Sequence, residues 1–502
     1  MGIKSLELDP TWKNVYNTLV ADAVGHNKNL WQFACFCSVQ ESRCSIALDS
    51  GWGTGKTFFL KQLEMIFNCI DLKENEREEI ENVFSECRNS NAIVNELKPH
   101  VCVYYDAWLN DNAEDPMQSI LYCLIKHKSE QFLKQSKVNE ESKKKIIAFA
   151  NSVKEFVKVL CQFNTKKDLI LDAIAPLENL VPLGLGKITE SIKASNPTHD
   201  IEVQKSFHDA FDKFLKSLIP SDNTRLLILI DELDRCKPTY AVQLLERIKH
   251  YLSSDRVTFV FAINDEQLQY TIKAFYGDEF NAHQYLDRFF DHRLVLPQID
   301  NLKFEKYYGF CQSKQSTPSQ DTDIDSLLME TCNSFLESFP LSMREELKFR
   351  SQVKVLSDSA RKDRRFINNS SWWLVVFVLL PFLLGLRLKD KKLYNDFVNG
   401  KNEEPILPVI ATSRHITCLL SDPEHYRTSS PLAFRNMQEE KAFKNFDTVY
   451  QCLFVDKLRK QTHVEIQPFF LDREMIDILF SALGFMADFI KYDTNTEETA
   501  NG

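Results

Sequence analysis

The residues from Ser45 to Thr57 constrain the fold of this chain more than any other segment. A largely apolar run at 45–49 indicates a short buried strand, and a helix is expected to begin at Thr57. Between them, glycines at 51, 53 and 55 let the backbone turn tightly and point its N–H groups inward. Such a loop at a helix N-terminus favours an anion, and we expect a polyphosphate there.

Two side chains at the start of this helix carry the chemistry of a phosphate-binding loop. Lys56 can reach the β- and γ-phosphates, and the Thr57 hydroxyl can ligate Mg²⁺. Ser50 occupies the first glycine position of the usual G-x-x-x-x-G-K-[ST] pattern, so Gly51 and Gly53 are expected to supply the flexibility. A glycine-rich turn that binds nothing is the alternative. The predicted nucleotide-binding residues are Ser50, Gly51, Trp52, Gly53, Thr54, Gly55, Lys56, Thr57 and Phe58.

A second apolar run, at 226–230, ends in two acidic residues. This pattern is typical of a parallel strand buried on both faces, whose C-terminal end lies where ligands bind in open α/β sheets. Asp231 is the predicted Mg²⁺ ligand, through water, and Glu232 is predicted to orient or deprotonate the attacking water. A solvated turn is the alternative, but the Gly-Lys-Thr sequence in the same chain favours the catalytic interpretation.

Apolar runs of strand length alternate with helical segments through the first part of the chain. Strands are expected at 45–49, 100–105, 226–230 and 257–263, with a further one at 294–296. This alternation predicts an α/β fold with a doubly wound, mostly parallel sheet, and the phosphate-binding loop makes a P-loop NTPase fold the expected one. The expected regions are a helical lead-in at 1–44, a P-loop core at 45–298 with a helical insertion near 126–200, a helical lid at 299–398, and an extension with a disordered tail at 399–502.

Composition restricts the function classes. The net charge of −10 argues against direct nucleic-acid binding, which normally requires a broad basic surface. The 13 cysteines form no C-x-x-C pair and no secretory leader is expected, so we expect free thiols and a cytoplasmic location. No Cys/His set has the spacing of a zinc site.

The segment 372–386 is apolar throughout. It is shorter than the roughly 20 residues that a membrane-spanning helix needs, and it contains Pro381 and Gly385. We interpret it as a buried helix that is kinked or ended near Pro381. A transmembrane or membrane-dipping segment is the less favoured alternative.

Several short motifs lie along the chain between 52 and 369. They are Trp-Gly-x-Gly-Lys-Thr at 52–57, Tyr-Asp-Ala-Trp at 105–108, Ile-Asp-Glu-Leu-Asp-Arg-Cys at 230–236, Leu-Leu-Glu-Arg-Ile-Lys at 244–249, Phe-Val-Phe-Ala-Ile-Asn-Asp-Glu-Gln-Leu at 259–268, Tyr-Leu-Asp-Arg-Phe-Phe at 285–290 and Ser-Ala-Arg-Lys-Asp-Arg-Arg-Phe-Ile-Asn-Asn at 359–369. Together these motifs resemble those of the KAP family of P-loop NTPases. The resemblance extends over roughly 10–395, and it is most specific at 226–297.

The resemblance implies two further catalytic residues in the core. Asn264 would contact the γ-phosphate or the attacking water, and its alternative role is a plain helix N-cap. Arg288 would act from a neighbouring subunit to neutralise charge that develops during phosphoryl transfer. Its alternative role is a surface salt bridge to Asp287 or Asp291.

A third implied catalytic residue lies in the predicted lid. Arg361 would approach the nucleotide as a second sensor, and Arg364 and Arg365 are alternatives because all three share two turns of one helix.

Three residues beside the predicted acids have open roles. Asp234 and Arg235 form a structural pair with each other, or Arg235 faces a neighbouring subunit. Trp108 is expected to be a packing residue rather than a platform for a nucleobase.

The resemblance implies a Mg²⁺-dependent ATPase that couples turnover to rearrangement of the lid and C-terminal segment. It would act as a homo-oligomer or on a partner protein through its C-terminal region, with defence against phage or mobile elements as a plausible setting. ATP is favoured over GTP because the chain has no N-K-x-D motif. The alternatives are a scaffold that binds ATP without hydrolysing it, and a membrane-associated exclusion or signalling protein that uses 372–386.

Overall fold

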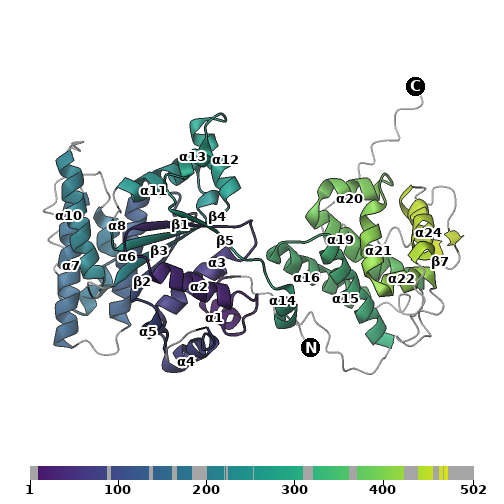
Figure 1. Ribbon diagram of the computed structural model, residues 1–502, viewed down its shortest axis with the longest axis horizontal. Helices are drawn as coiled ribbons and strands as arrows, with labels where there is room; N and C mark the ends of the chain where they lie inside the picture. Colours follow the sequence, from purple (N-terminus) through teal and green to yellow (C-terminus); the bar gives the residue numbers. More distant parts are fainter. Residues whose placement is uncertain are drawn as a thin grey trace. The chain divides into compact units, whose positions relative to one another are not determined.

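The protein separates into two compact units, an N-terminal unit, Glu7–Tyr307, and a C-terminal unit formed mainly by Tyr308–Gly502 (Figure 1). The computed structural model describes residues 9–87, 92–134, 139–160, 167–183, 201–219, 221, 224–250, 252, 254–308, 320–360, 370–422, 439–455, 463–466 and 469–472.

The N-terminal unit is built on a five-stranded sheet in the order β2-β3-β4-β1-β5. Every pair of neighbouring strands is parallel, which confirms the predicted α/β P-loop NTPase fold. The strands are β1 (Cys44–Asp49), β2 (His100–Asp106), β3 (Arg225–Asp231), β4 (Val257–Ile263) and β5 (His292–Val295).

Helices cover both faces of this sheet because successive strand residues point to opposite sides. Leu226, Ile228 and Ile230 of β3 pack into one hydrophobic core, and Leu227 and Leu229 pack into the other. The second core holds α1 (Trp12–Val20), α2 (Asn27–Ser38), α3 (Lys56–Phe67), α4 (Glu74–Val83) and α5 (Ile93–Glu96). The first holds α6 (Pro116–Leu133), α7 (Glu140–Leu160), α8 (Lys167–Asp172), α10 (Ile201–Leu218), α11 (Pro238–His250), α12 (Asp265–Tyr276) and α13 (Ala282–Leu286).

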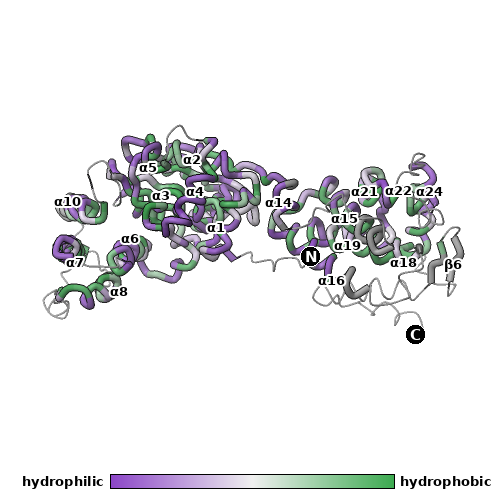
Figure 2. Tube along the Cα trace, turned by 90° about the horizontal axis from the view of Figure 1, so that it is seen from below, coloured by the Kyte–Doolittle hydropathy of each residue, from purple (hydrophilic) through white to green (hydrophobic). Residues whose placement is uncertain are grey.

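The helices α7 and α10 lie side by side at the margin of the N-terminal unit (Figures 1 and 2). Their contact is aromatic. The rings of Phe156 and Phe214 are stacked with centroids 5.2 Å apart, and Phe207 and Phe211 pack beside them. Burial of four large rings explains how a lysine- and glutamate-rich region forms a stable helix pair.

The register of the sheet brings four chemically important chain segments to one edge. Asp231 pairs with Asp106 on one side and with Ala262 on the other. Asp49 pairs with Ile263, so Ser50 and Asn264 follow neighbouring strands at the same level. The phosphate loop and the acidic residues are therefore collected at the C-terminal ends of parallel strands, the usual position of ligands in such folds.

The C-terminal unit is mainly helical and has its own core. Hydrophobic residues from 327–397 and from 406–469 pack into one cluster, so both sides of the predicted boundary at 398 share a core. That boundary as a functional division stays a prediction. The elements are α15 (Gln320–Ser338), α16 (Met343–Ala360), α18 (Ser370–Trp373), α19 (Leu380–Lys389), α20 (Lys391–Val398), α21 (Leu407–Thr412), α22 (Arg414–Ser421), α24 (Glu439–Tyr450) and the hairpin of β6 (His463–Ile466) and β7 (Phe469–Asp472).

The apolar segment at 372–386 lies in the centre of this core, as the buried-helix interpretation predicted. It does not end at Pro381. A π-helical turn, Leu374–Leu379, precedes the proline and joins α18 to α19. A wider turn relieves the clash that a proline ring causes inside a regular α-helix. Ser371–Lys389 is long and apolar enough to cross a membrane by composition, and 89% of its apolar window is buried within the protein.

Arg225 fixes the other end of β3 and gives a test of how the sheet is held. Its side chain is buried and donates to the carbonyl oxygens of Glu41 (3.0 Å), Asp255 (2.6 Å) and Ser42 (2.7 Å). The Arg225→Met variant should lose about 2–4 kcal/mol of unfolding free energy, because three carbonyl oxygens lose the charged donors of a buried side chain. Denaturant unfolding would measure this. The exposed Lys98→Met variant, which breaks a pair with Glu41, should change stability by less than about 0.5 kcal/mol. Equal losses of unfolding free energy in the two variants would contradict the role of Arg225 in holding the end of β3.

Candidate functional site

The phosphate loop has the conformation that its glycines allow. Gly53 and Gly55 have positive φ angles of 77° and 95°, and Gly55 is the N-cap of α3. Gly51 has no positive φ, and a Cβ there would meet nothing closer than Thr54 Cγ2 at 3.9 Å. The flexibility predicted for Gly51 is therefore not used, while that of Gly53 is. The side chain of Ser50, at the first glycine position, is hydrogen-bonded to Thr54.

Lys56 lies at the start of α3 and bonds to its own loop. Its Nζ donates to the carbonyl oxygens of Ser50 (2.6 Å) and Gly51 (2.9 Å). Burial lowers the pKa of Lys56, and nearby carboxylates oppose this change, led by Asp234 and Asp231. These acids lie at the end of β3 or just after it, so the ammonium of the loop lies in the field of that turn.

Asp231 is almost fully buried at the end of β3, with 1% of its surface exposed. Burial raises its pKa, and hydrogen bonds from Thr57 and Tyr104 oppose the rise. The Tyr104 hydroxyl donates to Asp231 Oδ2 at 3.0 Å. Sequence reasoning missed Tyr104, which lies on the neighbouring strand β2 and on the side of the sheet that α3 covers.

The residues present fit a magnesium ion. The Thr57 hydroxyl and the Asp231 carboxylate both offer oxygen atoms, and the hydroxyl lowers the pKa of that carboxylate. Among the described residues, no group of three His, Cys, Asp or Glu side chains could hold a metal. A cation held by few protein oxygens and completed by water and phosphate is the arrangement that Mg²⁺ prefers.

Glu232 follows in an unusual backbone conformation. Its φ is +61°, in the left-handed region, and its N–H donates to Asp231 Oδ1 at 3.0 Å. Burial raises the pKa of Glu232 to about 7; Asp231 contributes to the rise and Arg235 opposes it. Left-handed backbone at a residue other than glycine is typical of functional sites, and a pKa near neutrality suits a general base.

Asp234 and Arg235 have partners that the sequence did not predict. Trp52 Nε1 of the phosphate loop donates to Asp234 Oδ2 at 2.6 Å, and Arg235 Nε lies 2.5 Å from Glu232 Oε2. The expected pairing of Asp234 with Arg235 is therefore replaced by these contacts. Trp108 is half exposed and Arg235 lies 5.6 Å from its ring centroid, so it packs on a side chain and not in a core, and its role beside a nucleobase stays a prediction.

The two other predicted catalytic residues of the core occupy different environments. Asn264 Oδ1 accepts from the N–H of Gln267 at 3.2 Å and caps α12, while its role towards a nucleotide stays a prediction. The Arg288 side chain is exposed and has no ion pair within the part of the chain described. Asp287 pairs with Arg293 (3.0 Å), and Asp291 accepts from the Ser45 N–H (2.8 Å), so the salt-bridge alternative for Arg288 is not observed.

Two remaining predictions concern Phe58 and the lid arginines. Phe58 is half-buried against the core that contains α1 to α5, and contact with a nucleotide stays a prediction. Arg361, with its alternatives Arg364 and Arg365, lies outside the described residues.

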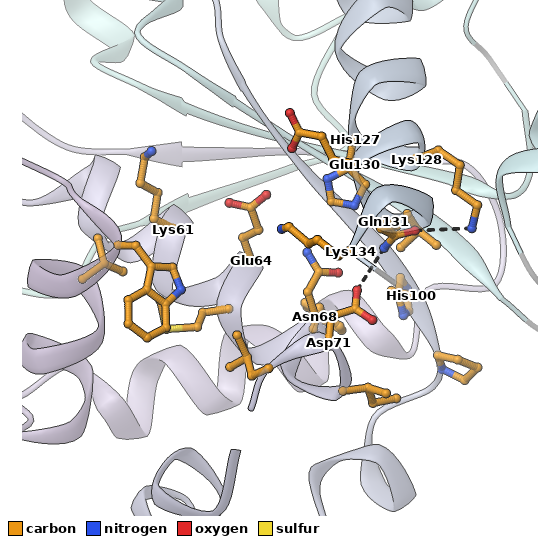
Figure 3. A pocket seen from close by; sticks show the side chains of 18 of the residues that line it. Lys61, Glu64, Asn68, Asp71, His100, His127, Lys128, Glu130, Gln131 and Lys134 are labelled. Atoms are coloured by element: carbon orange, nitrogen blue, oxygen red, sulfur yellow. Dashed lines mark hydrogen bonds between the residues drawn. The ribbon is translucent and has the colours of Figure 1, made fainter. Parts of the chain in front are cut away.

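A cavity of about 760 Å³ lies away from this site, between α3, α6 and the start of β2 (Figure 3). None of the predicted site residues lines it. Its wall carries both cationic and anionic side chains, and Gln131 donates to Asp71 across it at 3.0 Å. It does not coincide with the phosphate loop.

A model of the KAP family P-loop domain matches residues 24–369, which include the phosphate loop and the acidic residues at the end of β3. No curated protein matches the chain. The match covers more than half of the sequence and agrees with the observed fold. The chain therefore belongs to the KAP family of P-loop NTPases, a membership that implies nucleotide binding and hydrolysis.

Proposed function

We propose that this protein is a Mg²⁺-dependent ATPase that uses nucleotide turnover to rearrange its C-terminal part. One observation carries the proposal: the strand register brings the phosphate loop, which carries Lys56, to the same C-terminal edge of the sheet as Asp231, and Trp52 of that loop is hydrogen-bonded to Asp234 beside the acids. ATP is preferred on the sequence argument alone. The family also supports a setting in defence against phage or mobile elements, by analogy.

Each residue of the cluster has a distinct task. The N–H groups of the loop and Lys56 bind the phosphates, and Lys56 exchanges the carbonyl oxygens of Ser50 and Gly51 for phosphate oxygens. Thr57 and Asp231 would hold Mg²⁺, which neutralises charge on the phosphates when bound. Glu232 orients the attacking water and accepts its proton.

Arg288 supports action as a homo-oligomer. Its guanidinium is exposed while the acidic residues beside it have other partners. An exposed arginine of this kind can complete the site of a neighbouring subunit, where it would neutralise charge on the transferred phosphoryl group.

Removal of the loop ammonium tests nucleotide binding. Lys56→Ala should weaken ATP affinity by at least about tenfold, because charge-assisted hydrogen bonds to phosphate are lost. Titration with a fluorescent ATP analogue would measure the affinity. Lys73→Ala, which removes an exposed lysine from the same side of the sheet, should bind as the wild type does. Unchanged affinity of Lys56→Ala would refute the loop assignment.

Replacement of the proposed base separates binding from turnover. Glu232→Gln should bind ATP while phosphate release falls by about 10²–10⁴-fold, because only the proton acceptor is lost. Glu266→Gln, an exposed change in the first turn of α12, is the matched control and should retain the wild-type rate. A Glu232→Gln rate equal to wild type would leave hydrolysis without its assigned base.

Tyr104 gives a test of the metal site. Tyr104→Phe removes the hydroxyl that donates to Asp231, so the Mg²⁺ concentration for half-maximal turnover should rise about 10-fold or more. Tyr105→Phe is a matched control, because that hydroxyl bonds to Tyr240 on the opposite face of β2. A magnesium requirement that shifts equally in both variants would show a general effect on the strand instead.

A further inference from the structure

Arg235 lies between two tryptophan rings. Its guanidinium carbon is 6.0 Å from the ring centroid of Trp52 and 5.6 Å from that of Trp108. Its Nε contacts the Glu232 carboxylate, and the two side chains are 25% and 18% exposed. In this partly buried environment, the ring faces and the ion pair stabilise the guanidinium more than they would stabilise an exposed surface arginine.

We propose that Arg235 is the positioning residue for Glu232, and that Trp108 and Trp52 hold its guanidinium in place. The proposal deepens the proposed function, on which it rests. Arg235 does not touch the phosphates in this scheme. It fixes the direction of the carboxylate that must meet the attacking water, while the N–H of Glu232 is fixed by Asp231.

Trp108 is suited to this task because its turn is fastened to the end of β3. The Ala107 N–H donates to the Asp231 carbonyl oxygen at 3.0 Å, and the Leu109 N–H donates to Asp106 Oδ1 at 2.8 Å. These bonds hold the residues on both sides of Trp108 at the strand that carries the acids. Half the surface of Trp108 is exposed, so burial in a core does not account for its position.

Trp52 connects the same guanidinium to the phosphate loop. Its indole N–H donates to Asp234 Oδ2, one residue before Arg235, and its ring lies against the guanidinium. The loop that binds phosphate and the turn that carries Glu232 are thus joined by two contacts of a single side chain. A movement of the loop tip would therefore shift Arg235 and, with it, the carboxylate of Glu232.

The test compares four variants in the full-length protein. Arg235→Met should lower kcat for ATP hydrolysis by about 10- to 100-fold, because a misplaced catalytic group reacts slowly, while affinity for the ATP analogue stays within about threefold. Arg235→Lys, which retains the charge, should recover part of the rate. Trp108→Leu should lower kcat by about three- to tenfold through loss of one cation–π contact. The double variant should be no slower than Arg235→Met, because both changes remove one coupled unit.

Lys237→Met is the control, since it removes an exposed positive charge two residues from Arg235. Its kcat should match the wild type. The inference would be overturned if Arg235→Met hydrolysed ATP at the wild-type rate. It would also be overturned if the rate losses of Arg235→Met and Trp108→Leu multiplied in the double variant. A loss of nucleotide affinity as large as the loss of kcat would overturn it too, because Arg235 would then act in nucleotide binding. If Arg235→Met fails to fold by circular dichroism, Arg235→Lys and Trp108→Leu decide the question. If the wild type hydrolyses no ATP, the proposed function fails together with this inference. If the wild type hydrolyses ATP and Arg235→Met does so at the same rate, only this inference fails.

Discussion

Parallel pairing of four strands in one register places the phosphate loop and the acids together. β3 and β4 are buried on both faces, and Asp231 pairs with Ala262 while Asp49 pairs with Ile263. A slip of one residue in β3 would turn Asp231 to the other face of the sheet, away from α3 and Thr57. Alternate residues of β3 fill two separate cores, so such a slip would also misplace both sets of side chains. Packing of the strand therefore fixes the position of the carboxylate that we propose as a metal ligand.

This arrangement concentrates negative charge. Asp231, Glu232, Asp234 and Asp49 all act on Lys56, and burial opposes ionisation of Asp231 and Glu232. An acid-rich edge of low polarity repels phosphate unless cations lie between them. Lys56 and Arg235 supply part of the compensation, and hydrogen bonds from Thr57 and Tyr104 supply more. The excess of carboxylates gives a physical reason for a divalent cation in the proposed reaction.

Sequence reasoning predicted the candidate residues whose signal lies in their sequence neighbours, and it missed partners that contact them across the fold. Lys56 and Thr57 follow a glycine pattern, and Asp231 follows an apolar run, so local order was enough to predict them. The contact of Trp52 with Asp234 joins residues far apart in the chain. The Tyr104 contact requires knowledge that β2 neighbours β3, so neither of these two contacts has a signal within a short window of sequence. The ion pair of Arg235 with Glu232 spans only three residues and was missed although it is local.

The single core of the C-terminal unit determines how a conformational change can spread within it. The helix formed by α18, the π-helical turn and α19 contacts both α15 and α16, and α15 contacts α21 and α22. α22 in turn packs against α24. Close-packed cores transmit displacement because their side chains have little free volume. A shift of α16 would therefore carry the helices beyond residue 398 with it, so that the predicted lid and the following extension would move as one body rather than as two.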